Sequence, residues 1–204
     1  MKKLFVCSLA LGLASGLAGL AFSQTLGIET HGLYVFDFQG DLASYKLEPK
    51  DGGGGGLAFV VAATPYLKFD FGIDYFSANL KDSDFTGVKG GHIDMLPLTL
   101  GFRAGPSLDF AFLYAGAGIG RSFNNWSGGT GDGWVTLKDS MIYYACLGAE
   151  IFLTDILVLR PELRYNWLKP ELKGDPIVPW GETSWKEDWD LSHFQGRFGL
   201  GIYF

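Results

Sequence analysis

The segment HFQGRFGLGIYF, residues 193–204, indicates the fold more clearly than any other part of the sequence. Its residues form two alternating rows. The first row is apolar or small, with Phe194, Gly196, Phe198, Leu200, Ile202 and Phe204, and the second holds His193, Gln195, Arg197, Gly199, Gly201 and Tyr203. Because successive side chains of a β-strand point to opposite faces, the segment predicts a strand with one apolar face.

The same period of two recurs upstream, in residues 28–38, 57–65, 68–75, 95–103, 111–120, 141–153 and 157–167. Together with the last segment, these stretches predict eight strands. Short turns are expected at residues 64–66, 105–107 and 154–156, and long polar loops at residues 39–56, 79–91, 122–139 and 169–190. Even strand number with short turns at one end and long loops at the other predicts an all-β fold: an eight-stranded antiparallel transmembrane barrel with an up-and-down meander.

Two local features qualify this prediction. The five consecutive glycines at residues 52–56 are expected to form a flexible loop, since no helix and lysine follow them as in a phosphate-binding loop. Pro97 and Pro161 fall inside predicted strands, where each removes one ladder hydrogen bond. We therefore expect a local bulge at each proline.

Composition excludes several classes of protein. The 204 residues are 48% hydrophobic and 19% charged, which is too apolar for a disordered chain. The formal net charge of -6 argues against nucleic acid as a partner. After residue 23, no run of 18 apolar residues predicts a membrane-spanning helix.

Residues 1–23 have the organisation of a secretory signal peptide. Lys2 and Lys3 precede an uncharged apolar stretch from Leu4 to Phe22, and Ala21-Phe22-Ser23 offers a small-x-small cleavage site. An uncleaved membrane anchor is the alternative. Cleavage leaves residues 24–204 as the barrel domain, in which Cys146 is the one remaining cysteine and cannot form an intrachain disulfide.

Alternation alone does not say which row faces inward. Three observations favour a polar interior. The polar rows mix large and small residues, as a narrow lumen filled by side chains requires. No Lys or Arg interrupts the middle of an apolar row, where it would cost about 2 to 4 kcal/mol in lipid, and the last strand ends on Phe204.

Four segments resemble those of a known family. The ending FGLGIYF is similar to the terminal signature that the barrel assembly machinery recognises, carried here by Phe198, Leu200, Ile202 and Phe204. YAGAGIG (114–120), and GAEIFLTD (148–155) followed by LRPELRY (159–165), resemble strands five to seven of the small outer-membrane barrel superfamily. That superfamily includes the OmpA transmembrane domain, OmpX, OmpW and the opacity proteins. The resemblance implies a Gram-negative outer-membrane location with both termini in the periplasm.

With the polar rows inside, the predicted lumen contains charges of both signs in a space too narrow to hydrate them all. The structural interpretation is a charged plug of ion pairs, and the functional alternative is a gate for ions or small solutes. The predicted network consists of Glu29, His31, Asp37, Lys68, Asp70, Asp74, Arg103, Glu150, Arg160, Glu162, Arg164 and Arg197.

Tryptophans cluster in or beside the third and fourth long loops. An interfacial aromatic belt accounts for some of them. Their one-sided distribution also suits contact with a sugar, lipid or protein. The candidates for such contact are Trp126, Trp134, Trp180, Trp185 and Trp189.

No catalytic, cofactor or metal site is predicted. The three histidines lie in different strands without a catalytic motif, and the Asp-rich loop ends around Ser83 and Trp189 lack a full calcium ligand set. The sequence therefore favours a structural or surface-interaction protein whose partners are outer-membrane lipid, lipopolysaccharide, the barrel assembly machinery and an extracellular ligand bound by the loops. The alternatives are a narrow OmpW-like channel or carrier for small or hydrophobic solutes and, less favoured, a lipid-modifying enzyme.

Overall fold

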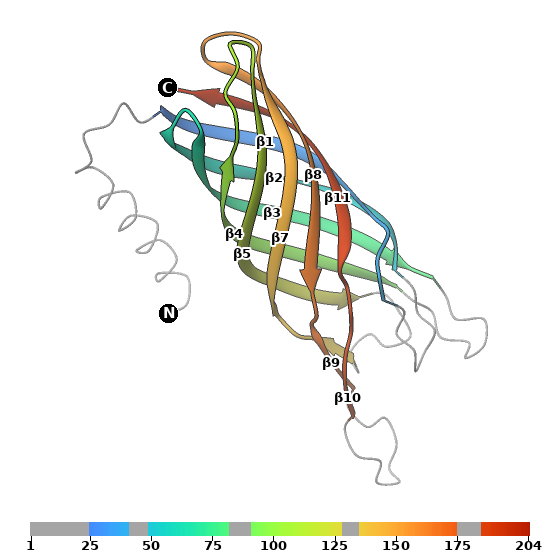
Figure 1. Ribbon diagram of the computed structural model, residues 1–204. Coiled ribbons are helices and arrows are strands. Elements are labelled where there is room, and N and C mark those ends of the chain that lie inside the picture. Colours follow the sequence, from blue (N-terminus) through green and yellow to red (C-terminus); the bar gives the residue numbers. More distant parts are fainter. Residues whose placement is uncertain (1–24, 41–48, 82–90, 128–134, 175–184) are drawn as a thin grey trace, which may run out of the picture.

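The computed structural model describes residues 25–40, 49–81, 91–127, 135–174 and 185–204, so the predicted signal peptide lies outside the described residues. Eight long strands close into one antiparallel barrel in the order β1-β11-β8-β7-β5-β4-β3-β2 (Figure 1). They are β1 (Thr25–Phe36), β2 (Pro49–Thr64), β3 (Leu67–Leu80), β4 (His92–Ala104), β5 (Ala111–Ser127), β7 (Ser140–Phe152), β8 (Leu157–Leu168) and β11 (His193–Tyr203). The predicted eight-stranded meander is confirmed.

The first and last strands close the barrel. β1 pairs with β11 from Gly27↔Tyr203 to Phe36↔Phe194. Beyond this ladder, the Leu26 amide donates to the Phe204 carbonyl at 3.0 Å, and the Phe204 amide donates to the Leu26 carbonyl at 2.8 Å. Closure leaves neither β1 nor β11 as a free edge. A β-sheet must be closed in this way to span a lipid bilayer.

Burial decides which row faces inward. In β3 the outward residues Phe69, Phe71 and Ile73 are 45%, 39% and 41% exposed, whereas the alternating Lys68 and Asp70 are 7% and 4% exposed. A soluble barrel has the opposite arrangement, with apolar side chains inside. The described part of the chain contains no helix long and apolar enough to cross a membrane.

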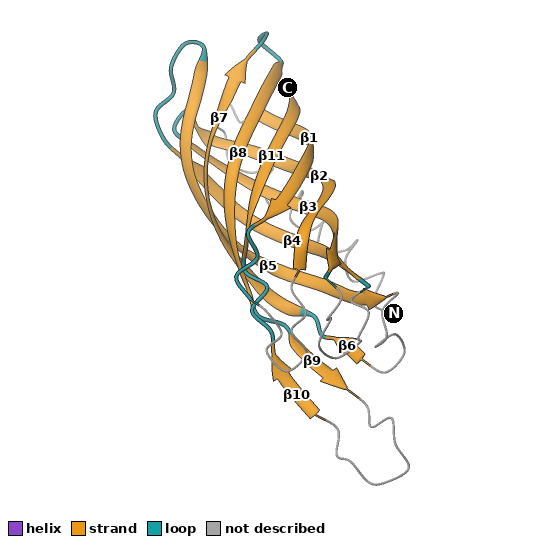
Figure 2. Cartoon of the chain, turned by 90° about the vertical axis from the view of Figure 1, so that its right-hand side faces the viewer, coloured by secondary structure: helices purple, strands orange, loops and turns teal. Residues whose placement is uncertain are grey.

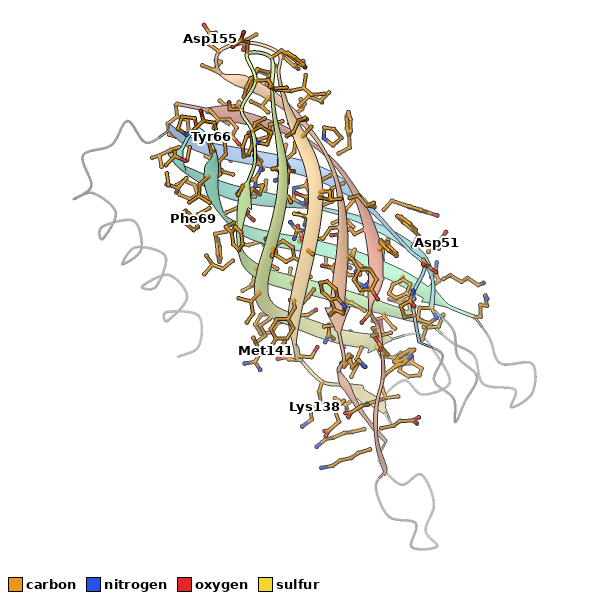
Figure 3. The ribbon with its side chains drawn as sticks, viewed as in Figure 1. Asp51, Tyr66, Phe69, Lys138, Met141 and Asp155 are labelled. Atoms are coloured by element: carbon orange, nitrogen blue, oxygen red, sulfur yellow. The ribbon has the colours of Figure 1, made fainter. Side chains whose placement is uncertain are left out.

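The two ends of the barrel differ. Short connections between β2 and β3, β4 and β5, and β7 and β8 gather at one end, where Figure 3 labels Tyr66 and Asp155, and the C-terminus lies at the same end (Figure 1). At the opposite end, β5, β8 and β11 lead toward a second small sheet (Figure 2). We refer to these as the turn end and the loop end.

The second sheet occupies segments that the sequence predicts as loops. It contains β6 (Val135–Leu137), β9 (Glu171–Gly174) and β10 (Trp185–Asp188) in the order β10-β9-β6. Leu137 and Leu172 are cross-strand partners and are 3% and 0% exposed. This pair packs with buried residues of the barrel strands, so the small sheet covers part of the loop end.

The glycine run is a strand and not a flexible loop, which corrects the prediction. Residues 52–56 pair with β1 and with β3 inside β2. A Cβ at Gly54 would lie 2.7 Å from the Phe76 Cα, and a Cβ at Gly56 would lie 2.7 Å from His31 Nε2. Glycine is needed here because the neighbouring strand and the lumen side chains leave no room for a side chain.

We expect Gly54→Ala to destabilise the barrel and Gly53→Ala not to, although the two glycines are adjacent. Overpacking at Gly54 should cost about 1 to 3 kcal/mol of unfolding free energy. A Cβ at Gly53 meets no atom closer than 3.7 Å, so Gly53→Ala should be neutral or stabilising by about 0.4 to 1 kcal/mol. Urea unfolding in detergent measures both, and equal effects at the two positions would contradict this account.

The expected proline bulges are wrong. Pro97 pairs with Ser122 of β5, and Pro161 pairs with Phe198 of β11, without a register shift. On the opposite side of each strand the residue pairing stops beside the proline and resumes in the same register. Each proline thus interrupts one ladder, and the register shifts found between described strands lie in β2 instead.

Candidate functional site: the barrel lumen

Inward-facing charges gather in the half of the barrel nearer the turn end and at its middle. Five carboxylates balance five cations, and every one of these residues is between 0% and 7% exposed. They are Glu29, Asp70, Asp74, Glu150 and Glu162 with Lys68, Arg103, Arg160, Arg164 and Arg197. The strict alternation of the strands brings them together from β1, β3, β4, β7, β8 and β11.

Arg103 of β4 organises the first group of ion pairs. Its Nη1 donates to Glu150 Oε1 at 2.7 Å and to Glu29 Oε1 at 3.2 Å. Its Nε donates to Asp70 Oδ1 at 3.3 Å. A guanidinium has five N–H donors in a fixed planar fork, so Arg103 can join three strands at once.

Glu29 of β1 is the acidic counterpart of Arg103 in this group. It accepts from Arg160 Nη1 at 2.5 Å and from the Tyr203 hydroxyl at 2.7 Å, in addition to Arg103. Glu150 also pairs with Lys68. Charge-assisted hydrogen bonds of this kind offset the large cost of removing charges from water.

A second group lies nearer the middle of the barrel and centres on Glu162. This carboxylate accepts from Arg164 Nη2 at 3.0 Å, from Arg197 Nη1 at 3.4 Å and from the Tyr114 hydroxyl at 2.9 Å. Arg197 also pairs with Asp74. Glu162 therefore fixes β8, β11 and β5 relative to one another.

His31 joins the second group as predicted. Its Nε2 lies 2.8 Å from Asp74 Oδ1, and the side chain is buried. The glycine at position 56 leaves the space that this contact occupies. His31 thus acts as a lumen hydrogen-bonding residue between β1 and β3.

Asp37 does not belong to the network, which corrects the prediction. β1 ends at Phe36, and Asp37 follows with a φ of 54° and an exposed side chain. The left-handed backbone breaks the alternation that would have turned this side chain inward. The other eleven predicted lumen residues all lie in the buried interior.

At the turn end, the lumen opens into a cavity of about 570 Å³ whose lining includes Lys68, Phe112, Phe152 and Tyr203. The Lys68 ammonium lies 4.5 Å from the Tyr203 ring centroid and 5.0 Å from that of Phe112. Cation–π contacts and the Glu150 pair hold this lysine in place. Lys68 and the aromatic rings thus separate the cavity from the charged interior.

Among the described residues, the loop half of the lumen is mostly apolar and has no buried carboxylate, lysine or arginine, although the polar His193 and Asn166 are buried there. The sequence analysis did not predict this apolar half. Inward residues there include Leu33, Val35, Phe76, Ile93 and Met95, all at most 7% exposed, and the small sheet adds Leu137 and Leu172 to the same cluster. The signal was present: the inward rows lose their charged residues toward the loop end of each strand. The outward rows, which stay mostly apolar toward the loop end despite the exposed Arg121 and Asn125, concealed this change.

Two of the predicted contact tryptophans close the apolar half. Trp126 and Trp189 are 7% and 1% exposed, and their ring centroids lie 6.1 Å apart. They pack into the cluster of Leu33 and Phe76 and are not available for an external ligand, which corrects the prediction for these two residues. Trp134 and Trp180 lie outside the described residues, as does the side chain of Trp185.

Outward aromatic residues instead mark the wall near the loop end. Tyr143 and Trp167 are cross-strand partners and are 51% and 46% exposed. Tyr165 contacts Trp167 and Phe194 with ring centroids 4.8 and 4.7 Å apart. This arrangement has the form of the aromatic girdle at a membrane interface.

Comparison with known proteins gives matches in structure but not in sequence. No family model matches the chain, and neither does any curated protein. Among solved structures, OprG from Pseudomonas aeruginosa is similar with a TM-score of 0.73 and 17% identity, over 88% of this chain and 95% of that chain. AlkL in lipid bilayers has a TM-score of 0.65 and 14% identity over 92% of both chains.

The outer membrane protein W of E. coli is also similar, with a TM-score of 0.55 and 16% identity over 91% of this chain and 100% of that chain. Identities this low show the fold alone. The chain has the fold of the small outer-membrane β-barrels, and its eight closed strands, apolar wall and charged lumen agree with that class.

Proposed function

Because the chain has the fold of the small outer-membrane β-barrels, we propose that the protein resides in a Gram-negative outer membrane. We further propose that it acts as a structural or surface-interaction protein. Both termini face the periplasm in this proposal, and the loop end faces outward. Its partners are outer-membrane lipid, lipopolysaccharide, the barrel assembly machinery and a ligand bound by the outer loops. The proposal includes no catalytic step, metal or cofactor.

The observation that carries the proposal is the filled lumen. Five buried carboxylates and five buried cations neutralise one another across the barrel, and an apolar cluster follows toward the loop end. Each of these ten groups has at least one partner of opposite charge, while Nε and Nη2 of Arg160 have no hydrogen-bond partner among the described residues. A barrel filled in this way supports a rigid scaffold better than a path for solutes.

The second candidate is a carrier for small or hydrophobic solutes. The apolar loop half of the lumen favours it, since Leu33, Phe76 and Met95 provide apolar surface for contact with an apolar solute. The charged half then blocks passage along the barrel axis. A carrier must break ion pairs such as Arg197–Asp74 or move its cargo by another route.

Orientation is tested by labelling single cysteines on intact cells in a Cys146→Ser background. Asn125, exposed near the loop end of β5, should react as Asn125→Cys with a membrane-impermeant maleimide. Asp155→Cys in the β7–β8 turn, also exposed, should react only after the outer membrane is permeabilised. Gly129 and Glu182, which lie outside the described residues, extend the test. If Asp155→Cys alone were labelled in intact cells, the topology would be the reverse of the proposed one.

A further inference from the structure

The outer face of the small sheet concentrates lysines. Lys173 of β9 and Lys186 of β10 are direct cross-strand partners, so their side chains leave the same face. Lys173 also pairs with Thr136 of β6. Lys138 stands two residues after Thr136, and its amide donates to the Glu171 carbonyl at 2.9 Å, which continues the same ladder and places Lys138 on this face.

The three lysines repel one another. The Lys173 ammonium, helped by that of Lys186, lowers the pKa of Lys138. Like charges directly opposite each other destabilise an antiparallel pair. Two carboxylates share the face, since Glu171 pairs with Asp188 and lies 3.1 Å from Lys173 Nζ, yet they leave an excess of one positive charge. A chain of net charge -6 thus carries a local cationic surface at its loop end.

The position of this surface relative to the aromatic girdle suggests its partner. Lys138 lies close to the start of β7, where Met141 is 48% exposed on the wall, and Figure 3 shows Lys138 beyond Met141 on the loop side. At about 3.3 Å per residue, Lys138 is at most about 17 Å along the chain from Tyr143 of the girdle. In a membrane, the anionic headgroups lie just beyond such a girdle.

We propose that Lys138, Lys173 and Lys186 form a binding site for the phosphate groups of lipopolysaccharide in the surrounding outer leaflet. The proposal rests on the proposed outer-membrane location. Ammonium groups act as phosphate binders through charge and three donors each. The inner face of the sheet packs on the barrel through Leu137 and Leu172, which holds the lysines at a defined height.

The test uses the full chain, purified and delipidated, with fluorescent bisphosphorylated lipid A in mixed non-ionic micelles. Each lysine at an anionic membrane surface contributes about fivefold in affinity, so the triple variant Lys138→Gln/Lys173→Gln/Lys186→Gln should bind about 100-fold more weakly. A charge-matched control removes the exposed Lys50, Lys81 and Lys169, which lie outside this sheet, and should bind as the unmodified chain does. Conversely, Glu171→Gln/Asp188→Asn should bind severalfold more tightly.

Dephosphorylated lipid A should bind the unmodified chain as weakly as the triple variant binds the phosphorylated form. Equal binding of the two lipids, or equal losses in the triple variant and its control, would overturn the proposal. Inorganic pyrophosphate that competes at the affinity of lipid A would reassign the site to soluble phosphates. Because binding is measured on purified protein, a reversed topology in cells would refute the proposed function without changing this result.

Discussion

Replacing Glu162 by Ala should lower the free energy of unfolding by about 3 to 5 kcal/mol. The change leaves Arg164 and Arg197 buried beside a missing carboxylate, since Glu162 accepts from their guanidinium groups at 3.0 and 3.4 Å. It also leaves the Tyr114 hydroxyl without its acceptor. Breaking a buried pair by removing one partner costs about this much because a charge is left uncompensated. Urea unfolding in detergent or liposomes measures the loss.

Asp37→Asn is the matched control for this prediction. Asp37 is exposed and lies outside the lumen, so its neutralisation should change the stability by less than about 0.5 kcal/mol. Glu162→Gln keeps the size of the side chain and provides a second readout if the alanine variant fails to fold. A loss below about 0.5 kcal/mol for both Glu162 variants would mean that β8 presents this face to water.

The period of two carries most of the fold and of the site. In β8, the alternation puts Arg160, Glu162 and Arg164 on one face, and the arguments for a polar interior then place all three in the lumen before any contact is known. Their partners follow from closure of the barrel, because few positions are left for buried charges. The particular pairs do not follow, since the Arg197–Asp74 pair depends on the registers of the ladders that connect β11 to β3 through β1 and β2.

Predictions from local composition are wrong at positions where tertiary contacts determine the backbone conformation. A run of five glycines has low strand propensity, yet pairing with β1 and β3 on either side makes residues 52–56 a strand. Phe76 and His31 leave no room for side chains at Gly54 and Gly56. The prediction for Asp37 is wrong because its own left-handed backbone ends the alternation of β1. The alternating sequence pattern does not indicate where such a residue interrupts a strand. The sequence predicts Trp126 in the long loop at residues 122–139, whereas β5 extends to Ser127 and therefore includes Trp126.

The filled lumen leads to the second prediction, that the protein does not conduct ions. A passing ion must separate pairs such as Arg103–Glu150 and Arg197–Asp74, which span the barrel from different strands. If each passage breaks one pair at a cost of about 3 kcal/mol, it slows by more than about 100-fold. The apolar cluster at the loop end adds a dry barrier, since ions lose hydration there without gaining a partner.

Single-channel recording of the full chain in planar lipid bilayers tests the sealed lumen most directly. Folding of the barrel in the same preparation is verified by the heat-dependent shift in gel mobility that folded barrels show. A sealed lumen gives a flat baseline without resolved current steps across the accessible voltage range. Stable, reproducible steps that scale with salt concentration would contradict it and make the channel, not the scaffold, the function of this barrel.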